Sequence, residues 1–161
     1  MTQTIANGLL AILDKLQVQN IIINKQGEVS SNFKQLLNLL KKKKIKVIAV
    51  TAGDKVQIDK ECYFEILFPQ TKLISSNVLN NNSIVAKFCM ENKKRKVFSM
   101  LFTGDIEQIA EKQMIELYQE SKSLEATVLK VAHHGSKTSS TKPWLELVKP
   151  KIALIRSRKK Q

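Results

Sequence analysis

The sequence predicts a single α/β domain in which helices alternate with the strands of a layered sheet. Leucines recur at helical spacing in GLLAILDKLQV (8–18), and IKVIAV (45–50) has the length of a buried strand. ECYFEILF (61–68) alternates its side chains as a half-buried strand does. A chain of 161 residues, 43% of them hydrophobic, is long enough to build one core but not comfortably two. We therefore expect one domain over residues 1–161.

The first half of the chain predicts two helix–strand pairs and then a strand of a different kind. The helix at 8–18 precedes a short buried strand, IIIN. A second helix, NFKQLLNLLKKKK, ends in lysines that suit the negative end of its dipole, and the strand at 45–50 follows. TAGDKVQID (51–59) predicts a turn before the strand at 61–68, which Pro69 ends.

The second half predicts a hairpin followed by two more helix–strand pairs. NNNSIVAKFCM (80–90) and VFSMLFT (97–103) flank a basic turn and form the hairpin. The remaining elements are a helix at 106–120, a strand at 126–132, a short helix at 143–149 and a strand at 150–155. This order describes a mixed α/β layered domain whose middle is an antiparallel meander over 61–103.

The chain is strongly basic, with 27 Lys and Arg against 14 Asp and Glu and a net charge of +13. The charge gathers in KKKKIK (41–46), KKRK (93–96) and RSRKK (156–160). A solvated surface is the favoured interpretation, and a surface that binds DNA is the alternative. The spacing of the two cysteines predicts neither a disulfide framework nor a zinc finger. The apolar runs are too short for a transmembrane segment and no signal peptide is evident, so we expect a cytoplasmic chain.

Two loops carry the residues that are suited to chemistry. Each follows an apolar strand and precedes a helix: TGD at 103–105 and HHGS at 133–136. We expect Asp105 and the two histidines to meet at neighbouring strand ends, where α/β folds gather their sites. If His133 and His134 continue the strand they point to opposite faces, so that one is a metal ligand and the other a support, while Gly135 turns the chain away.

By spacing alone, these residues are equally suited to purely structural roles. Asp105 is well placed to be the N-cap of the following helix, and the histidines suit a hydrogen-bonded loop pair. An aspartate and one histidine are also an incomplete ligand set, because catalytic zinc usually takes three protein ligands.

The combination of LFTGDIEQIAE (101–111) with VLKVAHHGSKTSST (128–141) resembles the metallo-β-lactamase-fold domain of ComEC-type competence proteins, the DNA-internalisation proteins of bacteria. The resemblance implies an αββα sandwich with a binuclear zinc or manganese centre that activates water to cleave a phosphodiester or similar ester. It gives Asp105 the role of bridging ligand, and one of the histidines that of a second ligand, with His134 preferred over His133. The implied catalytic residues are thus Asp105 and His134. The supporting residues are Asn82, Ser83, Gly104, Gly135 and Ser136.

The chain departs from the family pattern at both ends. MTQTIAN (1–7) stands where the family has its H-x-H-x-D-H motif, and IRSRKKQ (155–161) stands where the family continues with a Ser-Gly and a Tyr-Gly-His-Pro segment. We therefore expect a sandwich that is incomplete at both ends, binds neither zinc nor manganese stably, and has no independent hydrolase activity. The alternatives are a basic nucleic-acid-binding module and one half of a split phosphodiesterase, completed by a polypeptide that carries the missing motif. Gene decay, a split gene and a misassigned start codon account for such a chain equally well. Complete family members lie in the inner membrane.

Overall fold

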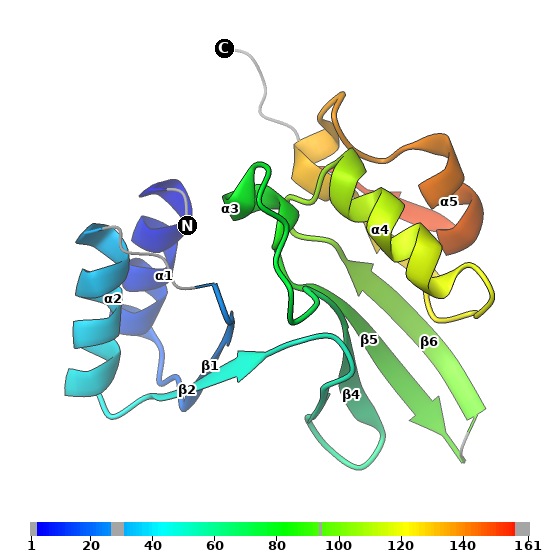
Figure 1. Ribbon diagram of the computed structural model, residues 1–161. Coiled ribbons are helices and arrows are strands. Elements are labelled where there is room, and N and C mark those ends of the chain that lie inside the picture. The colour runs from blue at the N-terminus through cyan, green and yellow to red at the C-terminus, as the bar shows by residue number, and fades with distance from the viewer. Residues whose placement is uncertain (1–2, 27–30, 94, 157–161) are drawn as a thin grey trace. The chain divides into compact units, whose positions relative to one another are not determined.

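The computed structural model describes residues 3–26, 31–93 and 95–156, and Figure 1 shows the course of the chain. The contacts divide it into two compact units, residues 1–50 and 51–161. Each unit is described by itself. The grouping of both units into one domain over 1–161 stays a prediction.

The first unit is a pair of parallel strands connected through a helix. Its elements are α1 (Gln3–Lys15), β1 (Asn20–Asn24), α2 (Ser31–Lys42) and β2 (Lys46–Val50). Parallel strands need a crossover between them, and α2 supplies it. Leu13 of α1, Leu36 and Leu40 of α2 and Ile21 of β1 are buried together, so the leucine spacing that predicts the helices also forms this core.

The second unit contains a six-stranded sheet. The strands in spatial order are β3 (Lys55–Gln57), β4 (Cys62–Phe68), β5 (Val85–Asn92), β6 (Arg95–Phe102), β7 (Val128–Lys130) and β8 (Ile152–Leu154). The pairs from β3 to β6 are antiparallel, whereas β6, β7 and β8 run parallel. The carboxyl ends of the last three strands therefore lie at the same edge of the sheet.

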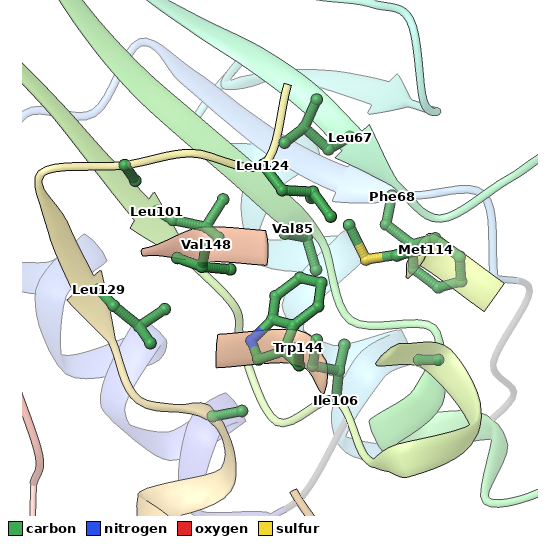
Figure 2. Close-up of a cluster of buried hydrophobic side chains, with 13 residues drawn as sticks. Leu67, Phe68, Val85, Leu101, Ile106, Met114, Leu124, Leu129, Trp144 and Val148 are labelled. Atoms are coloured by element: carbon green, nitrogen blue, oxygen red, sulfur yellow. The ribbon is translucent and has the colours of Figure 1, made fainter. Parts of the chain in front are cut away.

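One face of this sheet is covered by helices. The helical segments of the unit are α3 (Val78–Asn81), α4 (Gln108–Tyr118), the 3₁₀ turn η1 (Ala132–Gly135) and α5 (Lys142–Val148). Met114 of α4 and Trp144 of α5 are fully buried against Leu101 of β6 and Leu129 of β7 (Figure 2). This apolar cluster holds the segments after β6 and β7 in place.

The structure confirms the predicted α/β class and the antiparallel strands over 61–103, and α4 lies within the predicted helix at 106–120. It differs at two places. The predicted turn at 51–59 contains β3, because Val56 pairs with Phe64 across a hairpin. The strand predicted at 80–90 begins only at Val85, because the short helix α3 precedes it. The αββα sandwich implied by the family resemblance stays a prediction.

Candidate functional site

The two polar loops meet at one edge of the sheet, as predicted. Thr103, Gly104 and Asp105 follow β6, and His133 and His134 follow β7, its parallel neighbour. The two loops are joined directly, because the backbone N–H of His133 donates a hydrogen bond to the carbonyl of Gly104 over 3.2 Å.

Asp105 and His134 form the more open of two acid–imidazole pairs. Nε2 of His134 lies 3.9 Å from Oδ1 of Asp105, and the side chains of His134 and Asp105 are 51% and 20% exposed. Both side chains are therefore partly exposed to solvent. A metal ion has access to this pair.

The histidines do not alternate across a strand, and that part of the sequence prediction is wrong. They lie in the 3₁₀ turn η1 with φ angles of 45° for His133 and 56° for His134, both in the left-handed region. The chain turns between them, so their ring centroids are 6.4 Å apart with the planes at 60°. As a result each imidazole has a carboxylate of its own.

The carboxylate that faces His133 belongs to Glu107, which sequence reasoning missed. Nδ1 of His133 lies 3.3 Å from Oε1 of Glu107, which is within ion-pair distance although the hydrogen-bond geometry is not met. Glu107 also accepts hydrogen bonds from Asn77 and Thr138 over 2.8 and 3.1 Å. Asn80 donates a third, longer one. Glu107 thus accepts three hydrogen bonds in addition to its contact with His133.

These contacts fix the charge state of Glu107. Burial acts to raise its pKa, but the hydrogen bonds from Asn77, Thr138 and Asn80 and the charge of His133 outweigh it, and the pKa is lowered. Glu107 is also the N-cap residue of α4, so the alternative that Asp105 caps this helix is wrong. Asp105 lies two residues before the cap, which leaves its carboxylate available to the site.

Gly104 and Ser83 bring the turn before Asp105 close to the start of β5. Gly104 has a φ of +57°, and a Cβ placed there would lie 2.6 Å from Cβ of Ser83. The Ser83 hydroxyl accepts a hydrogen bond from the backbone N–H of Asp105 over 3.2 Å. Glycine is required at 104 both by its backbone conformation and by this close approach.

Of the predicted supporting residues, Asn82 lies outside the immediate site. Its side-chain amide is bonded to the backbone of Ile74 and Val78, so it holds the loop before α3. Its neighbour Asn81 contacts the site instead, because its Oδ1 accepts the backbone N–H of Glu107. A run of three asparagines gives no local signal that tells these two apart.

Gly135 and Ser136 shape the turn that follows the histidines. Gly135 has a φ of +77°, and the N–H of Ser136 donates to the carbonyl of His133 over 3.0 Å. The hydroxyl of Ser136 lies 3.0 Å from that of Thr138, which in turn donates to Glu107. The turn therefore connects back to the acid that faces His133.

Two further charged residues at this edge were not predicted. Lys130, at the end of β7, donates a hydrogen bond to the carbonyl of Gly104 over 3.1 Å. Burial lowers the pKa of this lysine, and the nearby charge of Asp105 opposes the shift. Glu111 is fully buried and accepts hydrogen bonds from the backbone of Ser140 and Thr141. It fixes the loop that carries Ser136 and Thr138.

Asp105 and His134 fit two positions of a metal centre but not a complete one. Two ligand atoms of a tetrahedral zinc site are about 3.4 Å apart, so the observed 3.9 Å needs an adjustment of about 0.5 Å. Within the described residues, no group of three or more His, Cys, Asp or Glu side chains is placed to hold a metal ion. The site thus resembles part of a metal cage.

Comparison with known proteins finds a similarity that covers most of the chain. The chain is 29% identical over 144 residues to ComE operon protein 3 of Bacillus subtilis (strain 168). This match covers 89% of the chain and 17% of that protein. The chain is 48% identical over 56 residues to the uncharacterized protein YcaI of Escherichia coli (strain K12), covering 35% of this chain and 7% of that protein. The chain thus spans about a sixth of the length of the first relative and less of the second. No family model matches.

The similarity to ComE operon protein 3 agrees with the predicted resemblance to ComE-type proteins over most of the chain. Among the described helices, none combines the length and the apolar character needed to cross a bilayer. The metallo-β-lactamase fold and the ligand roles of Asp105, His133 and His134 stay predictions.

Proposed function

We propose that this chain is part of a metallo-β-lactamase-like hydrolase domain of a protein associated with DNA uptake, and that it contributes two ligands of a metal centre without independent hydrolase activity. The observation that carries the proposal is the pairing of Asp105 with His134 at 3.9 Å, at the carboxyl ends of two parallel strands. The similarity to a competence operon protein supports its biological setting.

The chemistry of the two side chains suits zinc or manganese. A carboxylate oxygen and an imidazole nitrogen are ligands that both metals accept, and such a metal supplies an activated water when bound. The residues of this chain hold and orient these groups. Ser83 fixes the backbone of Asp105, and the left-handed turn at the histidines directs His134 toward Asp105 and His133 toward Glu107. We therefore assign His134 to the metal and His133 to a supporting contact.

We expect the chain to have no hydrolase activity of its own because it supplies too few metal ligands. A hydrolytic zinc usually has three protein ligands, and Asp105 with His134 supplies two. We expect purified protein to contain no stoichiometric zinc or manganese, and to show no phosphodiesterase activity on a nitrophenyl phosphodiester that Asp105→Ala removes. About one tightly bound ion per chain, together with activity lost in both Asp105→Ala and His134→Ala, would contradict this. Glu116→Ala, on the exposed side of α4, is the surface control.

The two-ligand site has a positive test of its own. The chain has only two histidines, so its proton NMR spectrum contains two imidazole Hε1 signals, one from each ring. Substoichiometric Mn²⁺ should broaden the His134 signal before that of His133, and Asp105→Asn should remove the difference. Equal broadening of both signals, or a preference for His133, would show that the metal does not bind between Asp105 and His134.

A further inference from the structure

A recess lies at the end of the parallel strands that is opposite to the candidate metal site. Its volume is about 440 Å³, and it is lined by the middle of β6 and by the segments that lead into β7 and β8. The lining residues are Phe98, Ser99, Lys122, Glu125, Ala126, Thr127, Lys149 and Lys151. Asp105 and the histidines follow the carboxyl ends of these strands, whereas this recess adjoins their amino ends. It is therefore separate from the candidate metal site.

The wall of the recess is positively charged. Three lysines line it against one carboxylate, Glu125, which lies 3.3 Å from the ammonium of Lys149. Lys122 and Lys151 are exposed, and within the described residues neither has a carboxylate within ion-pair distance. The recess thus retains two lysines that no acid of the described residues pairs with.

The backbone holds this arrangement in place. The N–H of Thr127 donates to the hydroxyl of the buried Ser99 over 3.2 Å, and the carbonyl of Thr127 accepts the N–H of Lys151 over 3.0 Å. The N–H of Ala126 donates to the carbonyl of Val148, next to Lys149. These bonds join the segment before β7 to the segment before β8, so the positions of Lys149 and Lys151 are fixed by the sheet.

We propose that this recess binds the phosphate group of a nucleotide, with Lys122 and Lys151 as its main contacts. Its volume lies in the range of small-ligand sites, which is about 300–1,000 Å³. Lysine is a common phosphate ligand, and Thr127, which also lines the recess, is a residue type whose hydroxyl can donate a hydrogen bond to phosphate. None of these residues belongs to the three basic runs of the sequence, so the site does not depend on overall charge alone.

The phosphate can come from a free nucleotide or from the backbone of single-stranded DNA, and two probes distinguish these sources. The first is a fluorescein-labelled thymidine 12-mer followed by fluorescence anisotropy. The second is thymidine monophosphate added as a competitor. Displacement by the monophosphate assigns the site to a single nucleotide, whereas binding of the 12-mer without displacement assigns it to the DNA backbone.

The test variant is Lys122→Gln/Lys151→Gln, and its charge-matched control is Lys72→Gln/Lys112→Gln. Both control lysines are exposed and lie outside the recess. The test variant should raise the Kd for the 12-mer about tenfold or more, because each lysine makes a charge-assisted contact. Its slope of log K against log salt should fall by about 1–1.5, as expected when two contacts to a single strand are lost. The control should change the Kd less than twofold.

Equal weakening by both variants would assign the binding to general positive charge and overturn the proposal. The absence of 12-mer and monophosphate binding at low salt would overturn it as well. All four lysines are exposed, so the variants should fold, and unchanged thermal unfolding midpoints check this. The outcome does not depend on metal binding at Asp105 and His134, since the wild-type protein is compared with its variants without added metal.

Discussion

Gly104→Ala should destabilise the second unit more than the same replacement at Gly53 or Gly135. The φ of +57° places residue 104 in the left-handed region, where an L side chain costs about 1–2 kcal/mol. The new Cβ would also lie 2.6 Å from Cβ of Ser83, well inside the ~3.5–4.0 Å of a favourable carbon contact. Relief of such an overlap typically costs about 1–3 kcal/mol.

The two effects together predict a loss of about 2–5 kcal/mol in the free energy of unfolding. This is a large part of the roughly 5–15 kcal/mol typical of a whole domain. The overlap can be separated from the backbone strain through Ser83. Ser83→Gly removes the Cβ of residue 83 that overlaps with the new methyl group, whereas Ser83→Ala keeps this Cβ and removes only the hydroxyl. We expect Ser83→Gly to recover about 1–3 kcal/mol in the Gly104→Ala background, and Ser83→Ala to recover none.

Urea unfolding followed by circular dichroism measures these differences. Gly53→Ala is the control, because Gly53 also has a positive φ, +96°, but has no heavy atom within 4 Å of the added Cβ. The decrease in the free energy of unfolding of Gly53→Ala should come from backbone strain alone, and Ser83→Gly should not change it. A Gly104→Ala loss below about 1 kcal/mol would refute the reasoning, since strain alone predicts more than this. Equal recovery by Ser83→Gly and Ser83→Ala would refute the carbon overlap.

Two further predictions concern acids other than the proposed metal ligand Asp105. Glu111→Ala leaves the half-buried backbone donors of Ser140 and Thr141 without this acceptor. It should lower the free energy of unfolding by about 2–4 kcal/mol in a urea titration, against less than about 0.5 kcal/mol for the exposed Glu116→Ala. Equal losses would show that Glu111 does not hold the loop. Asp59 accepts backbone hydrogen bonds from Glu61 and Cys62, which lower its pKa below the ordinary 3.8. The contribution of Asp59 to stability is present above pH 3.8 and is lost as the pH falls through the lowered pKa. Asp59→Asn should therefore make the free energy of unfolding decrease less steeply as the pH falls below about 4. An unchanged slope would contradict this.

Much of the fold could be read from local patterns. Helical spacing of leucines predicts α1, and alternation over 61–68 predicts β4, because each pattern matches the period with which its element buries side chains. β3 was missed because Lys55–Gln57 has little apolar character of its own. It becomes a strand through its pairing with β4.

The meeting of Asp105 with His134 was also determined by the sequence. Each residue ends an apolar strand that a helix follows, and parallel neighbouring strands bring such ends to one edge. The expectation of strand alternation at the two histidines was wrong because it assumed extended backbone, whereas the chain enters a left-handed turn at His133. The two imidazoles nevertheless face different carboxylates, Glu107 and Asp105.

Only the tertiary structure decided which residues surround this pair. Glu107 receives hydrogen bonds from Asn77 and Thr138, which lie 30 and 31 residues away in opposite directions along the chain. Glu111 holds a loop 29 residues away. Local sequence determines the period of an element and where it ends, because these depend on near neighbours. The partners of a buried acid depend on which distant loops the packed core brings to it, and no short-range pattern encodes that.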